Sequence, residues 1–343
     1  MTRRRRAARV VDATLVAAGF VLLLGLVWRV GGGTLLDHLR LVGAAILLIV
    51  GQEALAVVAN TLGWRAAFPM GTAPPLPRLL AARIAGDAVN YVTPTASLGG
   101  ELVRARLLDG RVPRLALATS IAVAKLGQTV GQAAFVAAGL ALAVAAGQLA
   151  PALRTASLVS IAVLGTLVVA LSMAQRRGLL APLARLVTAA GPLARFAHLR
   201  GHAARLDAEI AKLHRAPDRP FLLSCVCFFV GWALGAVEIA LMLWLLGVGV
   251  TATRAITIEA LSVGLDAMVF FVPAKLGTQE GGKVLIFTAL GLDPALGLAV
   301  GVLRRIRELV WALAGLVIVG RTGLGRDAAA EAARASSGPL TTD

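Results

Sequence analysis

Charged residues are scarce in this sequence. Asp, Glu, Lys and Arg make up 15% of its 343 residues, whereas hydrophobic residues make up 58% and the mean hydropathy is +0.82. A soluble domain carries about 25% charged residues. Several apolar runs reach the ~20 residues that a helix needs to cross a bilayer, and the ~10-residue alternating segments of a transmembrane barrel are lacking. The composition therefore argues against an ordinary soluble protein and indicates an all-α polytopic membrane protein.

Acidic residues, cysteines and histidines are also few. The 34 basic and 18 acidic residues give a formal net charge of +16. No basic stretch alternates with stacking aromatics, so we expect no nucleic-acid partner and assign the basic residues to cytoplasmic loops. Cys225 and Cys227 lie in an apolar run, where thiols act as small hydrophobes. The 4 histidines lack the spacing of a metalloprotease site, so we expect no metal and no cofactor.

The apolar runs predict about six full spans and two interrupted segments. The spans are expected near residues 10–30, 41–62, 115–146, 155–174, 221–246 and 294–320. The interrupted segments, at about 84–108 and 256–291, contain Pro and Gly between apolar stretches. We interpret residues 1–320 as a single transmembrane domain and residues 321–343 as a short polar tail that is expected to be disordered.

Basic residues set the expected orientation. Residues 1–10 contain five arginines, and the stretch 175–219 contains nine basic residues against three acidic ones. Because basic residues are retained in the cytoplasm, the N-terminus and the 175–219 loop should be cytoplasmic, in a multi-pass protein of the inner (plasma) membrane. On this orientation, segment 84–108 should enter from the cytoplasm and return. Segment 256–291 should enter from outside and return, so that both are re-entrant helical hairpins.

The two interrupted segments share a pattern. Residues 90–108 read NYVTPTASLGGELVRARLL, and residues 269–287 read VFFVPAKLGTQEGGKVLIF. In both, an aromatic residue and Val are followed by Pro, then by Leu-Gly, and then by Glu two or three residues later. Matching segments that enter from opposite sides suggest an inverted repeat. In many transporters, such repeats with broken helices place a binding site near the membrane midplane.

Further polar side chains lie within the predicted spans. Lys125 and Gln128 share a face of one span, and Arg304, Arg307 and Glu308 share a face of the last one. Internal ion pairs would account for them; so would a hydrophilic cavity that admits a phosphate-bearing headgroup, a task suited to the forked guanidinium of Arg. We predict no catalytic residue. The predicted substrate-binding and translocation residues are Asn90, Pro94, Gly99, Gly100, Glu101, Arg104, Lys125, Gln128, Glu238, Pro273, Lys275, Gly277, Gln279, Glu280, Gly281, Arg304, Arg305, Arg307 and Glu308.

These motifs resemble a known family. Residues 272–316, VPAKLGTQEGGKVLIFTALGLDPALGLAVGVLRRIRELVWALAGL, resemble the C-terminal signature of the flippase-like transmembrane domain of lysylphosphatidylglycerol synthases. NYVTPTASLGGELVRARLL resembles its first signature, and LGWRAAF resembles the Trp-Arg motif after its second span. Within that family, AVAKLGQTVGQAAFVAAGLAL and GWALGAVEIALMLWLLG look most like the hopanoid-biosynthesis-associated membrane proteins. One departure is Ala274–Lys275, where the family usually has a small residue and often Gly.

The resemblance implies a flippase-like protein that translocates or admits a polar or anionic lipid, such as a hopanoid precursor, a polyprenyl-phosphate-linked lipid or a phospholipid. The synthase members carry a soluble aminoacyl-transferase domain after the membrane part. This chain ends 23 residues after Gly320, so we do not expect it to be an enzyme. Membrane lipids are the expected partners. No P-loop is present, so movement would be downhill or ion-coupled.

Two alternatives remain open at this stage. The first is an integral membrane lipid-modifying enzyme that uses Glu101 and Glu280 as acid–base groups. The second is a non-transporting scaffold of a lipid-synthesis complex. Its partners would be lipid-biosynthesis enzymes docked on the 175–219 loop.

Overall fold

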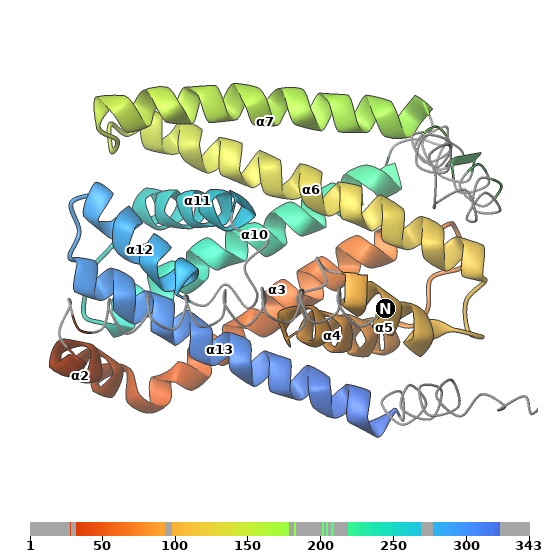
Figure 1. The fold of residues 1–343 in the computed structure, drawn as a ribbon, viewed down its shortest axis with the longest axis horizontal. Coiled ribbons are helices and arrows are strands. Elements are labelled where there is room, and N and C mark those ends of the chain that lie inside the picture. Colours follow the sequence, from red (N-terminus) through yellow and green to blue (C-terminus); the bar gives the residue numbers. More distant parts are fainter. Residues whose placement is uncertain are drawn as a thin grey trace, which may run out of the picture.

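The chain is helical wherever its structure is described. The computed structural model describes residues 32–92, 98–177, 219–268 and 277–322, together with single positions at 28, 182, 201, 204, 207 and 208. Helices follow one another in these ranges without a strand, which confirms the predicted all-α fold (Figure 1). They are α2 (Gly32–Val42), the short 3-10 helix η1 (Gly43–Ala45), α3 (Ile46–Ala66), α4 (Leu76–Val92), α5 (Leu98–Leu108), α6 (Arg114–Ala145), α7 (Pro151–Arg177), α10 (Arg219–Leu245), α11 (Ala252–Met268), α12 (Thr278–Ala289) and α13 (Pro294–Arg321).

Length, composition and exposure indicate that these helices lie in a membrane. Four stretches among the described residues are long and apolar enough to cross one: Gly33–Ala66, Arg114–Ala145, Pro151–Ala170 and Arg219–Leu245. Large apolar side chains cover the outside of α7, where Leu158 and Val163 are 51% and 60% exposed. Acyl chains would cover such a surface, whereas water would make it an aggregation liability. The chain is therefore a multi-pass membrane protein.

The predicted spans agree with the helices to within a few residues where they can be compared. Helices α3, α6, α7, α10 and α13 correspond to the spans expected from about residues 41, 115, 155, 221 and 294. With 28 residues at ~1.5 Å each, α13 is long enough to cross the ~30 Å hydrocarbon core. The first predicted span, most of the 175–219 loop and the tail after residue 322 lie outside the described residues.

Each interrupted segment contains two helices. The first comprises α4 and α5, and the second comprises α11 and α12. Helix α4 starts at Leu76, eight residues before the predicted start of the hairpin, because Pro77 lies in its first turn, where a missing N–H is tolerated. The connections at 93–97 and 269–276, which contain Pro94, Pro273 and Lys275, lie outside the described residues.

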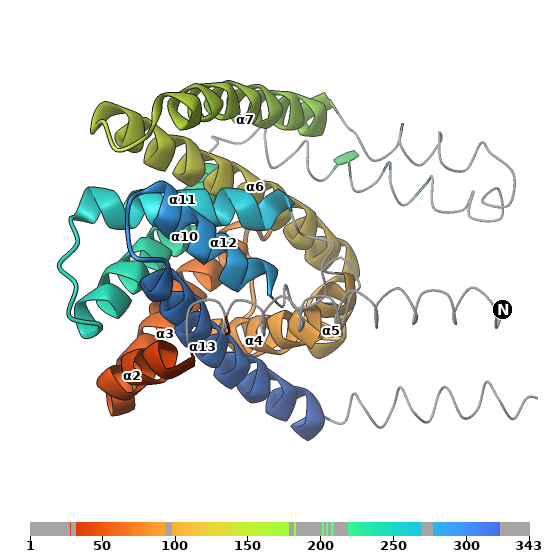
Figure 2. The same ribbon diagram turned by 60° about the vertical axis from the view of Figure 1, so that its left-hand side comes forward.

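The two halves of the chain repeat one order of elements. An N-terminal half, α3–α6, and a C-terminal half, α10–α13, each consist of a long helix, two shorter helices and a second long helix. Helix α4 packs against α13, and α11 packs against α6 (Figures 1 and 2). In each half, the first of the two shorter helices therefore contacts the last long helix of the other half. Helices α3 and α10 pack on each other between them.

Glycines bring the helices of the two halves together. A Cβ atom on Gly315 of α13 would lie 2.4 Å from the Ala88 Cβ of α4 and 2.4 Å from the Ile84 carbonyl oxygen. A Cβ atom on Gly139 of α6 would lie 2.4 Å from the Ala260 Cβ of α11. Helix backbones approach this closely in membranes where one residue has no side chain.

Three apolar clusters form the core of the described residues. One contains Ile239, Ile258, Phe287 and Leu298 from the four helices of the C-terminal half, all 0% exposed. A second surrounds Trp64 and joins α3 to α4, α5, α6 and α10. The third joins α6, α10 and α11. Charged side chains that lie beside these clusters are therefore removed from water and need partners within the protein.

We predict that Gly315→Ala destabilises the protein by about 1–3 kcal/mol, because the added methyl overpacks the α4–α13 contact. The measurement is thermal unfolding of the purified protein in detergent, followed by tryptophan fluorescence. Gly165→Ala is the matched control, because no atom lies within 4 Å of its added Cβ. It should leave stability unchanged or raise it by up to about 1 kcal/mol through helix propensity. Equal effects of the two changes would contradict close packing at Gly315.

Candidate functional site

Arg304 lies at the centre of a buried ionic network in the C-terminal half. Its Nη1 donates to Glu259 Oε1 at 3.1 Å, and its Nη2 donates to Glu259 Oε2 and to Glu238 Oε2, both at 2.8 Å. Arg304 is 5% exposed, Glu259 is 3% exposed and Glu238 is 2% exposed. The forked guanidinium thus joins α13 to α10 and α11 through charge-assisted hydrogen bonds, the strongest class available to side chains.

Arg307 extends this network to α3. Its Nε lies 3.0 Å from Glu238 Oε1, and its Nη1 forms an ion pair with Glu53. Glu238 therefore lies between two arginines that are three residues apart on α13. Because buried carboxylates lose their hydration, each of these glutamates depends on a guanidinium for compensation.

Arg305 joins α12 and α4 to α13. Its Nε lies 2.9 Å from Glu280 Oε1 on α12, and its Nη1 donates to the hydroxyl of Tyr91 on α4 at 2.8 Å. Glu308 lies 3.4 Å from the same Nη1 and accepts a hydrogen bond from Gln279 at 3.0 Å. We call the whole set the C-terminal network; it comprises Glu53, Tyr91, Glu238, Glu259, Gln279, Glu280, Arg304, Arg305, Arg307 and Glu308.

A second network occupies the N-terminal half. Arg104 of α5 forms an ion pair with Asp87 of α4 and donates to Glu101 Oε1 at 2.8 Å. Lys125 Nζ of α6 lies 2.9 Å from the same Glu101 oxygen, and Asn90 Oδ1 accepts the Gly100 N–H at 2.7 Å. We call this set the N-terminal network; it comprises Arg83, Asp87, Asn90, Gly100, Glu101, Arg104, Lys125 and Gln128.

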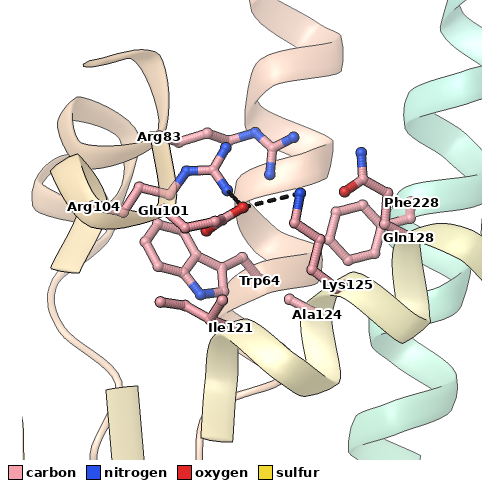
Figure 3. Close-up of a pocket in the computed structure, with 9 residues that line it drawn as sticks. All are labelled: Trp64, Arg83, Glu101, Arg104, Ile121, Ala124, Lys125, Gln128 and Phe228. Atoms are coloured by element: carbon pink, nitrogen blue, oxygen red, sulfur yellow. Dashed lines mark hydrogen bonds and ion pairs between the residues drawn. The ribbon is translucent and has the colours of Figure 1, made fainter. Parts of the chain in front are cut away.

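The N-terminal network borders a small pocket. Its walls include Trp64, Arg83, Glu101, Arg104, Lys125, Gln128 and Phe228 (Figure 3). In Figure 3 the cationic ends of Arg104 and Lys125 both approach the Glu101 carboxylate. Only about 10 Å³ is open to the centre of a water molecule, roughly the space of one water. Ion pairs among the lining side chains thus leave little open space in this pocket.

Aromatic rings hold two of the pocket's guanidinium groups. The Arg104 guanidinium lies 5.5 Å from the centroid of the Trp64 ring, and that of Arg83 lies 5.9 Å from the centroid of Phe228. Both distances fall in the range of cation–π attraction. The Arg83 Nε atom is buried, lies 3.4 Å from Asp87 and makes no hydrogen bond. Arg83 is thus held in position although its Nε–H group has no hydrogen-bond acceptor.

The two networks use equivalent positions. Glu101 binds Lys125 and Glu280 binds Arg305, and each cation lies eleven residues after the first residue of its long helix. Both glutamates keep their second oxygen, Oε2, buried and without a hydrogen bond. The contacts therefore repeat the correspondence that the Pro-Leu-Gly-Glu pattern indicated.

The structure distributes the predicted site residues between the two networks. Glu238, Gln279, Glu280, Arg304, Arg305, Arg307 and Glu308 belong to the C-terminal network. Asn90, Gly100, Glu101, Arg104, Lys125 and Gln128 belong to the N-terminal one. Gly99 and Gly281 lie in the first turns of α5 and α12, and Gly277 is the N-cap of α12 with a positive φ of 72°.

Several network residues were not among those predicted from the sequence: Glu53, Arg83, Asp87, Tyr91 and Glu259. A signal for one of them was present, because Asp87 and Asp266 each stand seven residues before the proline of a hairpin. No sequence signal marks Glu259 as the partner of Arg304. Within the described ranges, no group of three His, Cys, Asp or Glu residues could hold a metal ion.

We predict that Arg304→Met costs about 3–5 kcal/mol of stability, because it leaves Glu238 and Glu259 short of compensation in an apolar interior. Adding Glu259→Gln should recover part of that loss, since the uncompensated charge is then removed. Chemical denaturation in detergent would measure both. As a control, Arg40→Met breaks an exposed pair with Asp37 and should change stability by about 0–1 kcal/mol. A double variant less stable than Arg304→Met alone would contradict the pairing.

Comparison with known proteins agrees with this architecture. The chain matches the family described as the lysylphosphatidylglycerol synthase TM region over residues 10–315. No curated protein and no solved structure was found to match it. The match spans most of the chain and includes every described helix except the last residues of α13. The protein therefore belongs to the lysylphosphatidylglycerol synthase TM region family.

Proposed function

We propose that this protein translocates, or admits into its interior, a lipid with a polar or anionic headgroup. The observation that carries the proposal is the pair of ionic networks, each built on a largely buried glutamate of a helix pair, inside a chain whose outer surface is apolar. Apolar packing would stabilise such a bundle as well as buried ion pairs do. Intramembrane ionisable groups are instead characteristic of substrate pathways.

Helix α4 supplies a connection between the networks. Arg83, Asp87 and Tyr91 follow one another at four-residue spacing and share one face of the helix. Arg83 and Asp87 belong to the N-terminal network, and the Tyr91 hydroxyl accepts a hydrogen bond from Arg305 in the C-terminal one. We infer that a headgroup passes along this face while the acyl or isoprenoid chains stay in lipid.

The orientation rule places the networks at different depths. Arg65, Arg114 and Arg219 mark helix ends that should be cytoplasmic. Glu238 lies seven residues before the opposite end of α10, and Glu259 lies seven residues after the start of α11. The N-terminal network would then be nearer the cytoplasm and the C-terminal network nearer the outside, as an inverted repeat with two re-entrant hairpins requires. This topology belongs to an inner-membrane protein with a cytoplasmic N-terminus.

Opening the pocket requires that ion pairs exchange partners. A phosphate presents several oxygens to guanidinium and ammonium groups, so it can replace the Glu101 carboxylate on Arg104 and Lys125. Because the phosphate replaces the carboxylate, Arg104 and Lys125 each keep a negative partner throughout. This lowers the free-energy cost of moving a charged headgroup through the bundle. Hopanoid precursors, polyprenyl-phosphate-linked lipids and phospholipids all remain within this substrate class. We propose no catalytic step.

We predict that Glu101→Gln lowers lipid translocation about 10–100-fold, because a charge-assisted hydrogen bond worth about 1.5–3 kcal/mol is lost where cations exchange partners. Purified protein would be reconstituted into vesicles with fluorescent phosphatidylglycerol, phosphatidylcholine or a polyprenyl phosphate. A membrane-impermeant quencher would follow each lipid. Arg40→Met is the control and should retain wild-type rates. If folded wild-type protein moves none of these lipids, the transport proposal fails, and the scaffold or enzyme hypothesis takes its place.

A further inference from the structure

The pocket of the N-terminal network has more positive than negative side chains around it. Arg83, Arg104 and Lys125 line it, and Glu101 is the one carboxylate among its described lining residues. Asp87 pairs with Arg83 and Arg104 beside the pocket. Three cations against two carboxylates leave one net positive charge, so the local charge favours an anion as ligand.

Arg83 can form a further hydrogen bond. It is 7% exposed, and its buried Nε has no hydrogen-bond partner among the described residues. Its Nη1 donates to the Asn60 carbonyl oxygen at 3.4 Å, which is a long hydrogen bond. Asp87 lies 3.4 Å from the Nε, and Glu53, which also acts on Arg83, is bound by Arg307. A buried guanidinium with an unused N–H group is what an anion entering the pocket would satisfy.

Lys125 forms the exposed edge of the pocket. Its side chain is 44% exposed, whereas those of Glu101 and Arg104 are 15% and 8% exposed. Its ammonium has three donors and approaches Glu101 to 2.9 Å. Gln128 stands three residues later and lines the same pocket; in Figure 3 both side chains rise from α6 on one side of it. A headgroup entering there meets donors from Lys125, Gln128 and Arg83.

Displacement of Glu101 sets the charge that a ligand has to match. In the proposed function, a phosphate replaces the Glu101 carboxylate. Arg83, Arg104 and Lys125 then have Asp87 as their nearest carboxylate, which leaves two positive charges. A phosphate diester carries one negative charge, whereas a monoester carries about 1.5–2 at pH 7 and presents three terminal oxygens. The monoester therefore matches both the charge and the three donor side chains.

The remaining walls of the pocket offer little to a larger polar headgroup. The Trp64 ring lies against Arg104 and the Phe228 ring against Arg83. The Trp64 Nε1 already donates to Ser120 at 3.2 Å. Hydroxyl or amine groups carried beyond the phosphate would therefore find apolar faces there.

We propose that this pocket binds the terminal phosphate monoester of a lipid, the headgroup that phosphatidic acid and polyprenyl monophosphates present. The inference rests on the proposed function and narrows its substrate class. It assigns Arg83 and Lys125 to the second negative charge of the phosphate, which a diester lacks.

The test compares lipids that differ in the headgroup alone. Thermal unfolding of the full-length protein, freed of bound lipid by detergent exchange, would be followed with added phosphatidic acid or phosphatidylglycerol of the same acyl chains. Near pH 8 the monoester carries about two charges. Wild type should reach half of its maximal stabilisation with at least about tenfold less phosphatidic acid than phosphatidylglycerol, because a further charge-assisted contact forms.

Variants of the pocket locate the preference. Lys125→Met and Arg83→Met should each remove most of it, since one of the two unmatched positive charges is lost. Lys125→Arg keeps the charge and should retain the preference. Arg114→Met is the matched control, because it removes an exposed cation of the same helix that pairs with Asp109. Glu101→Gln should bind phosphatidic acid at least as tightly as wild type does, because the competing carboxylate is gone.

The outcomes separate this inference from the proposed function. Equal responses of wild type to both lipids would overturn the inference, and so would a preference that survives in Lys125→Met. A Lys125-dependent stabilisation by glycerol 3-phosphate that phosphatidic acid does not produce would overturn the lipid as the source of the monoester. Vesicles in which phosphatidylglycerol moves and phosphatidic acid does not would overturn the inference and leave the proposed function standing. Preferential binding of phosphatidic acid without movement of any lipid would refute the proposed function and support the monoester site.

Discussion

The sharing of Glu238 between Arg304 and Arg307 is the interaction on which the C-terminal half depends. One carboxylate on α10 accepts from two arginines of α13, and those arginines reach Glu259 on α11 and Glu53 on α3. Four helices thus meet around charges, and Arg304, Glu238 and Glu259 among them have almost no access to water. In a bilayer, partners for such charges have to come from the protein or its ligand, so the positions of these helices follow from the pairing.

Close packing and charge pairing support each other in this fold. Gly315 and Gly139 allow the last helix of each half to touch the first hairpin helix of the other half. That approach brings Tyr91 of α4 within hydrogen-bond distance of Arg305. The equivalence of the halves is incomplete in one respect, because Arg104 is bound by two carboxylates and Lys283 by none among the described residues.

Much of this fold could be predicted from the sequence, because long apolar runs and Pro-Gly interruptions are local signals. The positions of α6, α10 and α13 and the two glutamates of the hairpins followed from them. The partners could not be predicted, since Glu53, Glu259 and Tyr91 reach arginines through tertiary contacts that no local pattern encodes. The start of α4 was misplaced because prolines that suggest a turn also suit the first turn of a helix.

Accessibility to a thiol reagent tests most directly whether the two halves are inverted across the membrane. Single cysteines would replace the exposed residues Arg111, after α5, and Ala289, at the end of α12, in a chain whose Cys225 and Cys227 are changed to serine. An impermeant maleimide would be added to sealed right-side-out vesicles. For inverted halves we expect labelling of the cysteine at 289 in intact vesicles and of that at 111 only after permeabilisation. Labelling of both from the same side would contradict it.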